Sequence, residues 1–281
     1  MRKTRIFGVG FGIILSIVIG IYFVNQVDFQ EQIPESDVDE VFWKNSLFRV
    51  FVNENDWAIV DGKTIPLKAD FVLNEQLQHV YDEVGVYNLE VKPAVIIPTF
   101  TASAYGPNGF YDFYEKRCNE SCLTTTILRD SYDFKSSANA IKILDLLGYE
   151  MILDEQVDKD PNILEKYDKI ILLHNEYVTK TMFDAITSHP NVVYLYPNAL
   201  YAEIDVNYQE STISLIRGHN YPEPHIVNGF DWEFENTHPF EFDTICANWE
   251  FYRIDNGVML NCYPEQIVWQ DKEFLEAIKN Q

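Results

Sequence analysis

The sequence predicts an α/β protein with a doubly wound, mainly parallel sheet, a small N-terminal β unit and one N-terminal transmembrane helix. Short apolar runs at residues 94–98, 149–153, 170–173 and 192–195 are typical of strands buried on both faces. Segments with helical spacing of apolar residues separate these runs, and such alternation favours a parallel sheet between helix layers. A third observation is the long uncharged run near the N-terminus, which predicts the membrane helix.

One strand–helix–strand unit forms the centre of the predicted sheet. The apolar run 170–173 stops at the polar segment 174–177, Thr179 can cap a helix that Pro190 ends, and residues 192–195 form the next strand. This order predicts a right-handed parallel crossover, and ligands of such sheets bind beyond the carboxyl ends of the strands. The polar residues at the two strand ends are His174, Glu176, Asn198 and Tyr201. Solvated loops are the alternative, but two neighbouring strand ends with such clusters favour a site.

The first 27 residues predict a membrane anchor. A basic flank at residues 1–5 precedes an uncharged run at 6–24, which is 19 residues long. A bilayer core takes roughly 20 residues, and basic flanks stay in the cytoplasm, so the bulk of the chain is expected outside the cytoplasmic membrane. A cleaved signal peptide is the alternative, but the run is long and no A-x-A site follows it. We therefore expect an uncleaved, single-pass anchor.

The remaining chain divides into an acidic tether, a β unit and a main domain. The tether is expected at residues 28–46, the small β unit at 47–92 and the α/β domain at 93–281. In the β unit, strands are expected at residues 48–52, 57–60, 63–67 and 86–91. This unit offers few catalytic groups, which indicates a packing or spacing role.

The main domain begins with the strand at 94–98. The Gly, Pro and Asn residues between 99 and 111 predict a loop at the end of this strand. Ser136 or Ser137 can cap the next helix, and Gly148 is placed to end it. The expected elements that follow are a short helix from Asp160-Pro161, strands at 203–206, 212–216 and 257–261, and a final helix at 272–278.

Charge and cysteine content limit the class of protein. The net charge is −23, which repels nucleic acid and anionic lipid surfaces, so neither is expected as a partner. Solubility in a salty exterior also accounts for the charge. The four cysteines fit an oxidising compartment. Of the three possible connectivities we favour the neighbours, Cys118 with Cys122 and Cys246 with Cys262, the latter pair flanking an expected hairpin.

The motifs exclude several chemistries and favour one. The sequence has no Gly-rich phosphate loop and no G-x-S-x-G elbow, and its cysteines are better used in disulfides than as nucleophiles. The oxygen-rich and imidazole-rich set that remains comprises Glu176, His174, Tyr105, Tyr132, Asp231 and His219. Carboxylate and phenolate oxygens suit a hard cation such as ferric iron, which can act as a Lewis acid or activate water. His174 and Glu176 are two residues apart and can share one face of a strand end. His219 and His225 are a weaker metal candidate and are expected to be loop residues only.

The motifs resemble the large-subunit family of N,N-dimethylformamidase. The matching segments of this sequence are Tyr167-Asp168, His174-x-Glu176-Tyr177, Phe183-Asp184-Ala185-Ile186, Asn198-Ala199-Leu200-Tyr201, the loop up to Tyr111, the L-G-Y ending at Tyr149, and Gly229-Phe230-Asp231-Trp232. The resemblance covers roughly residues 93–235 and implies a domain similar to class I glutamine amidotransferases without their cysteine nucleophile. Asn175 and Val178 stand where that family usually has Asp and Trp.

The resemblance also implies an activity, namely hydrolysis of a small amide with mononuclear iron held by two tyrosinates and a glutamate. Carried over by position, Glu176 matches the iron-binding glutamate and His174 the catalytic histidine. Tyr105 and Tyr132 are the candidates for the two tyrosinates, and Asp231 for a second carboxylate, although aspartate is one methylene shorter. Two functions follow as hypotheses: a membrane-anchored, extracytoplasmic hydrolase of small amides or other C–N bonds, or a non-catalytic cell-surface binding module on the same fold.

Overall fold

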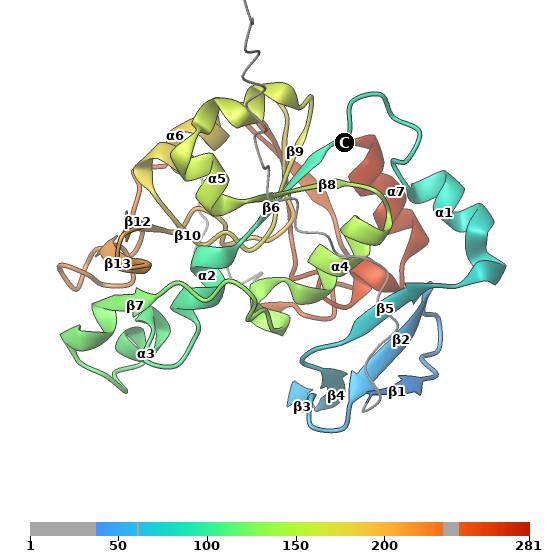
Figure 1. The fold of residues 1–281 in the computed structure, drawn as a ribbon, viewed down its shortest axis with the longest axis horizontal. Coiled ribbons are helices and arrows are strands. Elements are labelled where there is room, and N and C mark those ends of the chain that lie inside the picture. Colours follow the sequence, from blue (N-terminus) through green and yellow to red (C-terminus); the bar gives the residue numbers. More distant parts are fainter. Residues whose placement is uncertain (1–37, 61, 233–241) are drawn as a thin grey trace, which may run out of the picture.

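The computed structural model describes residues 38–60, 62–232 and 242–281, and a six-stranded sheet lies at its centre (Figure 1). Its strands are β6 (Ala94–Ile97), β8 (Glu150–Leu153), β9 (Ile170–Leu172), β11 (Val192–Tyr194), β14 (Phe251–Ile254) and β15 (Gly257–Leu260). Five of them are parallel, and β14 pairs antiparallel with β15 at the edge. The prediction of an α/β fold with a mainly parallel sheet is confirmed.

The order of the strands contains a reversal beside β6. The spatial order is β14-β15-β11-β9-β6-β8, so the chain first places β8 on one side of β6 and then crosses to β9 on the other side. In open parallel sheets, the crevice at such a switch point is where ligands bind. The carboxyl ends of β6 and β9 are therefore the part of the fold most suited to a site.

The strands are fully buried because helices cover both faces of the sheet. Every residue of β6, β9 and β11 is buried, which explains their uninterrupted apolar sequences. Alternate residues enter two separate cores: Val95 and Ile171 pack with the helices α4 (Ala138–Leu146) and α7 (Lys272–Asn280). Ile96 and Leu172 pack on the opposite face with α6 (Lys180–Ser188). The doubly wound arrangement follows from this alternation.

The caps of the helices agree in part with the sequence. Thr179 caps α6, since its side chain accepts the amide of Met182. Gly148, with a φ of +85°, follows the end of α4 as expected. Ser137 stands at the N-terminus of α4 but makes no side-chain cap there. Its hydroxyl instead accepts the amide of His174 at 3.0 Å, so the expected capping role is wrong.

The segment after β6 is helical where the sequence predicted a loop. It forms α2 (Thr99–Ala104) and α3 (Phe110–Tyr114), joined by the turn that contains Gly106. The turn residues identified in the sequence therefore separate two short helices. The remaining helices are α1 (Gln78–Val84), α5 (Asp154–Lys159), and 3₁₀ turns at Glu75–Leu77, Glu120–Leu123, Phe134–Ser136, Pro161–Lys166 and Ile267–Trp269.

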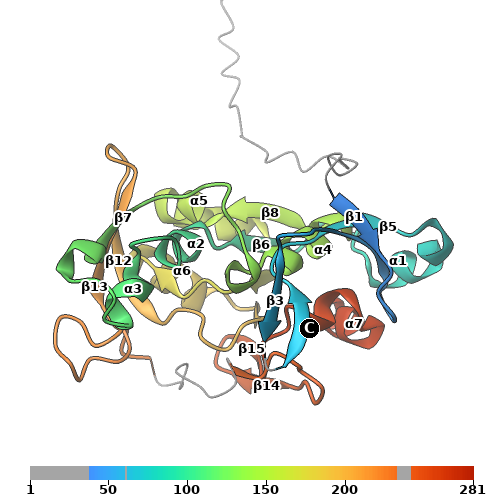
Figure 2. The same cartoon turned by 90° about the horizontal axis from the view of Figure 1, so that it is seen from below.

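Smaller sheets lie at opposite ends of the molecule (Figures 1 and 2). At one end are β7 (Thr124–Thr126), β10 (Tyr177–Val178), β12 (Ala202–Asn207) and β13 (Thr212–Arg217), in the order β10-β12-β13-β7. At the other end are β1 (Val38–Val41), β2 (Phe48–Asn53) and β5 (Asp70–Leu73), with a hairpin of β3 (Trp57–Val60) and β4 (Lys63–Pro66). Phe48 and Val50 of this end share one core with α4, which ties the β unit to the main domain.

The N-terminal unit departs from the prediction at two places. Residues 38–41, expected in the tether, form β1 and pair with β2. Residues 86–91, expected as a strand, form a turn in which the Val86 amide donates to the Leu147 carbonyl. The predicted membrane span at 6–24 lies outside the described residues, and among those that are described no helix has the length and apolar character to cross a bilayer.

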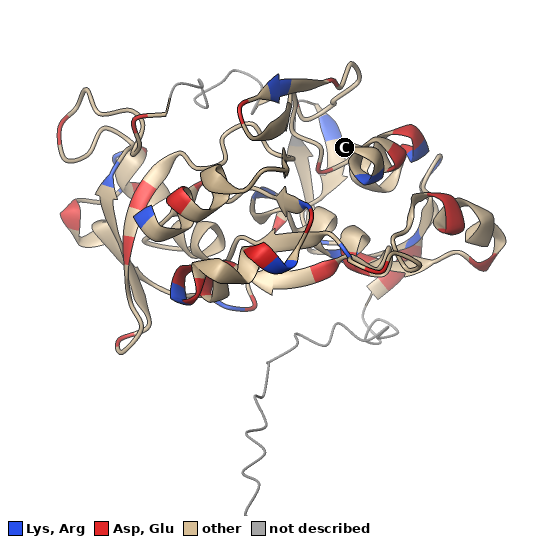
Figure 3. Cartoon of the chain, turned by 90° about the horizontal axis from the view of Figure 1, so that it is seen from above, with Lys and Arg blue, Asp and Glu red and all other residues tan. Residues whose placement is uncertain are grey.

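Two disulfides join the cysteine pairs expected from the sequence, Cys118–Cys122 and Cys246–Cys262. The second pair flanks the β14–β15 hairpin, and both are consistent with an oxidising, extracytoplasmic compartment. Acidic residues are spread over many elements rather than gathered in one patch (Figure 3). The charge of −23 therefore acts on the surroundings of the whole domain.

Candidate functional site

The polar segment after β9 is held in place by contacts from three other parts of the chain. The amides of Glu176 and Tyr177 both donate to the Thr101 hydroxyl of α2, at 3.0 and 3.2 Å. The Glu176 carbonyl accepts the amides of Tyr201 and Ala202, each at 2.9 Å. Ser137 holds the amide of His174. Because these bonds fix the backbone, the side chains of residues 174–177 have defined directions at the switch point.

The Glu176 carboxylate lies at the centre of a buried polar cluster. Its side chain is 2% exposed. The Tyr105 hydroxyl donates to Oε2 at 2.7 Å, and His219 Nε2 lies 2.7 Å from Oε1. The Tyr177 hydroxyl lies 2.9 Å from the same His219 nitrogen, so one N–H is shared between two oxygens. The expected convergence of Glu176, His174 and Tyr105 at one place is present in the structure.

His174 presents one nitrogen to this cluster in a defined tautomer. Its Nδ1 lies 2.5 Å from the Lys135 carbonyl, which can only accept, so Nδ1 carries the hydrogen. In the neutral ring, Nε2 then bears a lone pair, and this atom lies 3.4 Å from Glu176 Oε2 without a hydrogen-bond partner. Two electron-rich atoms that face each other in a buried place repel unless a proton or a cation lies between them.

His219 reaches Glu176 from a strained loop. It follows β13 and Gly218, and both His219 and Asn220 have positive φ values, 53° and 63°. Such backbone costs on the order of 1 kcal/mol for a residue other than glycine and persists where the surroundings enforce it. The amides of His219 and Asn220 donate to the Val227 and Ile226 carbonyls, at 2.9 and 2.8 Å. The loop therefore holds this imidazole in place in spite of an unfavourable backbone conformation.

Burial and neighbouring charges set the ionisation of the cluster. Burial opposes the charged form of Glu176, yet the hydrogen bond and charge of His219, with smaller contributions from His174 and Tyr105, hold its pKa below the usual value. Burial lowers the pKa of His174, partly offset by the Glu176 carboxylate. Burial and the Glu176 charge raise the pKa of the Tyr105 and Tyr177 phenols well above 10. The protein alone thus holds an anionic carboxylate between neutral phenols.

Two predicted site residues lie elsewhere. The Tyr132 hydroxyl is 3.0 Å from the Thr99 hydroxyl, and it is not among the polar partners of Glu176 in the described chain. Asp231 has a side chain that is 94% exposed, in an ion pair of 3.2 Å with Arg217. Tyr177, which the sequence placed only within a motif, is instead the second phenol beside the cluster. Its position directly after Glu176, at the start of β10, was the available signal.

A second buried carboxyl, which the sequence did not identify, lies behind His174. Glu265 is fully buried; it accepts the Asn139 amide at 2.5 Å and the Tyr196 hydroxyl. The Tyr196 ring stacks on the His174 ring, with centroids 5.7 Å apart and 16° between the planes. Burial raises the pKa of Glu265 to about 8. His174 therefore faces an ionised carboxylate directly and is linked through the Tyr196 ring to a carboxyl that keeps its proton at neutral pH.

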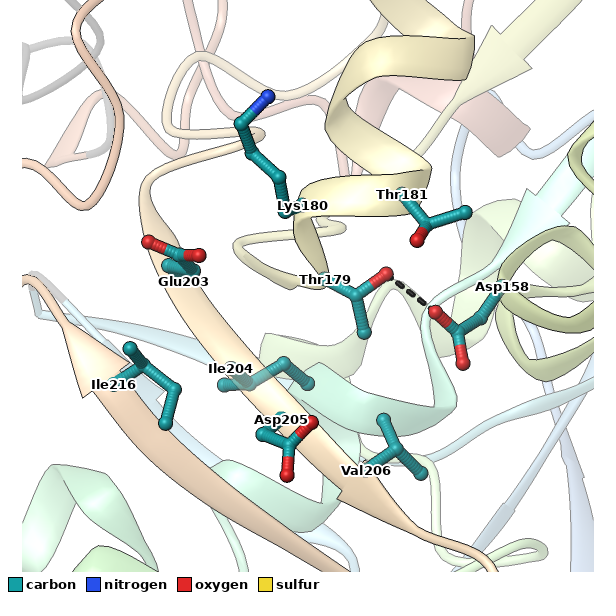
Figure 4. Close-up of a pocket in the computed structure, with 9 residues that line it drawn as sticks. All are labelled: Asp158, Thr179, Lys180, Thr181, Glu203, Ile204, Asp205, Val206 and Ile216. Atoms are coloured by element: carbon teal, nitrogen blue, oxygen red, sulfur yellow. Dashed lines mark hydrogen bonds between the residues drawn. The ribbon is translucent and has the colours of Figure 1, made fainter.

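The described residues also enclose a cavity outside this cluster. It has a volume of about 320 Å³ and lies between β12, β13 and the start of α6 (Figure 4). Asp158 accepts the Thr179 hydroxyl there, and Ile204 and Val206 line the side of β12. None of the residues predicted as catalytic or metal-binding lines this cavity, so its volume does not bear on the Glu176 cluster.

The donor atoms of the cluster fit a hard metal ion only if phenols take part. In the part of the chain that the structure describes, no group of three or more His, Cys, Asp or Glu side chains is arranged to hold a metal by itself. A metal at Glu176 would thus require a phenol oxygen, which Tyr105 offers beside Oε2. The unpartnered Nε2 of His174 is the observation that favours a cation there.

No family model matches the chain, and no curated protein matches it either. The resemblance to the N,N-dimethylformamidase large-subunit family therefore stays a prediction based on the motifs. What the geometry adds is independent of that resemblance: a carboxylate, two imidazoles and two phenols meet at the switch point of the sheet.

Proposed function

We propose that the chain is an extracytoplasmic hydrolase of small amides or related C–N bonds, with its reacting centre at Glu176. The observation that supports this proposal is the buried cluster at the sheet's switch point, in which His174 Nε2 lies 3.4 Å from the Glu176 carboxylate. Perturbed, converging ionisable groups at such a place are typical of active sites.

Glu176 and Tyr105 would hold a hard cation, with iron as the candidate, and Tyr177 would be the nearer second phenol in place of Tyr132. When bound, such an ion supplies Lewis acidity that polarises a substrate carbonyl. The remaining chemistry belongs to His174. Its neutral Nε2 can accept the proton of an attacking water as the new C–O bond forms, and return it to the nitrogen as the C–N bond breaks. The Lys135 carbonyl at Nδ1 stabilises the imidazolium between these steps.

Glu265 would act through its neighbours and is a positioning residue in this proposal. Its carboxyl holds the Tyr196 hydroxyl, and the Tyr196 ring fixes the plane of the His174 imidazole. The Tyr263 hydroxyl also supports this imidazole, 3.0 Å from the Lys135 carbonyl and 3.4 Å from Nδ1. These contacts give the base a single orientation.

The test combines elemental analysis with an amide assay on the full-length protein. We expect about one metal ion per chain after reconstitution with Fe²⁺ or Zn²⁺, and release of ammonia from formamide or of dimethylamine from N,N-dimethylformamide. The Glu176→Gln variant should lose both the metal ion and the hydrolysis. Tyr132→Phe is the matched control for Tyr105→Phe and should keep the metal. Full metal occupancy in Glu176→Gln, or no stoichiometric metal in the wild type, would contradict the proposal.

A non-catalytic binding module is the second candidate, and one observation favours it. Glu176 and His219 are 2% and 6% exposed, so the cluster is closed in this conformation, as a buried polar core would be. In that case Glu176→Gln would lower stability without affecting any amide hydrolysis, because none would be detectable in the wild type. The amide assay on metal-loaded protein separates the two functions.

A further inference from the structure

Three tyrosine rings continue from the Glu176 cluster toward the surface. Tyr105 and Tyr111 have ring centroids 4.7 Å apart, and Tyr111 and Tyr114 are 5.9 Å apart. Tyr105 ends α2 and the other two lie on α3, so the turn between these helices brings the rings together. Tyr105 and Tyr111 are partly exposed, and Tyr114 is 43% exposed. The row of rings therefore runs from the buried carboxylate to a tyrosine that is exposed to solvent.

An ammonium group already occupies this aromatic surface. Lys135 Nζ lies 5.3 Å from the Tyr111 ring centroid and 5.8 Å from that of Tyr105. Both distances are within the roughly 6 Å at which a cation is attracted to a ring face. Within residues 38–60, 62–232 and 242–281, Lys135 Nζ takes part in none of the ion pairs, although the chain is rich in carboxylates. In these residues, the Lys135 ammonium group thus contacts the two tyrosine rings and no carboxylate.

In the protein without a bound metal ion, the Glu176 carboxylate makes the seat more attractive to cations. The Tyr105 hydroxyl donates to this carboxylate at 2.7 Å, which pushes electron density into the ring that Lys135 contacts. The same ring lies 5.7 Å from the His174 ring, so the seat is one ring away from the proposed base. The net charge of −23 adds a long-range attraction for cations at low ionic strength.

We propose that the Tyr105–Tyr111 pair is a binding seat for the organic ammonium group of a substrate, and that Lys135 occupies this seat in the unliganded protein. The inference deepens the proposed function, on which its catalytic meaning rests, by naming amides that carry an ammonium group as the substrate class. A ligand cation would displace the Lys135 side chain into solvent, to which this residue is already exposed. The backbone carbonyl of Lys135 would stay on His174.

The first experiment measures binding alone, on full-length protein without added metal. Choline is the probe, and 3,3-dimethyl-1-butanol is its neutral isostere, since only the charge differs. Lys135→Met removes the resident ammonium and keeps an aliphatic side chain, so we expect it to bind choline roughly tenfold more tightly than the wild type. The isostere should bind at least roughly tenfold more weakly than choline to the same variant, as measured by calorimetry.

Ring variants test the seat itself. Tyr111→Leu in the Lys135→Met background should lose the preference for choline, whereas Tyr132→Leu, at a phenol away from the seat, should keep it. Thermal unfolding of each variant checks the fold. If Tyr111→Leu does not fold, the comparison of choline with its isostere on Lys135→Met still tests the proposal. Equal binding of the two probes, or no gain of choline affinity in Lys135→Met, would overturn the proposal.

A third arm separates this inference from the proposed function. Acetate that binds the wild type but not Lys135→Met would show that Lys135 is an anion receptor, and this result overturns the cation seat. Choline binding without amide hydrolysis would support the seat and contradict the hydrolase. Hydrolysis with the same kcat/KM for glycinamide, which carries an ammonium group, and for acetamide would support the hydrolase and contradict the seat.

Discussion

Glu176 and Glu265 are two buried glutamates connected to His174, the first directly and the second through Tyr196, and they differ in charge. Both side chains are at most 2% exposed. Glu176 has two imidazoles and a phenol as neighbours, and its pKa is held below the usual range despite burial. Glu265 has a backbone amide and a phenol, and burial raises its pKa to about 8.

The difference shows that the partner, more than the depth of burial, decides which carboxyl is ionised. Desolvation raises the pKa of both groups, and at Glu176 this effect is reversed mainly by His219 and His174, which can carry positive charge, with a smaller contribution from the Tyr105 hydroxyl. A pair of carboxyl groups with pKa values pushed apart is the usual arrangement for separate acid and base roles. His174 is connected to both, so its Nε2 can exchange a proton beside Glu176 while Tyr196, held by Glu265, fixes the orientation of the ring.

The largest expected effect comes from removing the charged member. Glu176→Ala leaves the His219 imidazole and the Tyr105 hydroxyl without their acceptor, and breaking such a buried set costs roughly 3–5 kcal/mol of unfolding free energy. Urea denaturation at pH 7 measures this loss. The control is Glu203→Ala, a partly exposed glutamate on β12, for which we expect a change within about 0.5 kcal/mol. Similar losses of unfolding free energy in the two variants would contradict the prediction that Glu176 stabilises the buried cluster.

The next largest effect is the pH dependence of stability, which has opposite signs for Glu265 and Glu176. Because folded Glu265 keeps its proton up to a pKa of about 8, against 4.5 for the unfolded chain, its stabilisation is complete below pH 4.5 and is lost as the pH rises toward 8. The shift corresponds to about 3 kcal/mol between pH 5 and 8. Glu176 has the opposite sign, since its stabilisation is present at neutral pH and is lost on acidification through its lowered pKa.

Glu265→Gln checks this prediction. The amide stays neutral, so the variant's unfolding free energy should fall about 3 kcal/mol less than that of the wild type between pH 5 and 8. Denaturant titrations at pH 5, 6, 7 and 8 give the two curves. Parallel curves would mean that Glu265 is ionised in the folded protein, and the contrast with Glu176 would disappear.

The Tyr105 and Tyr196 hydroxyls, which bond to Glu176 and Glu265, allow a comparison with a smaller expected change in stability. Tyr105→Phe removes a hydrogen bond to a carboxylate, which costs roughly 2 kcal/mol, whereas Tyr196→Phe removes one to a neutral carboxyl, which costs about 1 kcal/mol. Both variants keep the ring, so packing is matched. Chemical denaturation at pH 6, where Glu265 holds its proton, measures the difference. A larger loss in Tyr196→Phe would reverse the assignment of charge.

The sequence predicted what depends on local patterns. Continuous apolar runs identified the strands β6, β9 and β11 because such strands are buried on both faces, and the carboxyl end of β9 directed attention to His174 and Glu176. His219 is 43 residues from Glu176 and reaches it through a loop with positive φ, which no local spacing reveals. Tyr132 was misplaced for the same reason, since its contact with Thr99 depends on how the segment before α4 packs.

The smallest expected effect concerns Asp231, the second carboxylate that the sequence suggested. Its side chain is 94% exposed and its ion pair with Arg217 is therefore worth about 0–0.5 kcal/mol, so Asp231→Asn should leave the unfolding free energy nearly unchanged. Metal content and amide hydrolysis should also stay at wild-type values, whereas Glu265→Gln should lower the rate of hydrolysis through the orientation of His174. A loss of hydrolysis in Asp231→Asn with intact stability would mean that Asp231, and not Glu265, is the second carboxylate needed for hydrolysis. An exposed ion pair does not affect the site through stability, so such a loss would have to come from the Asp231 carboxylate itself.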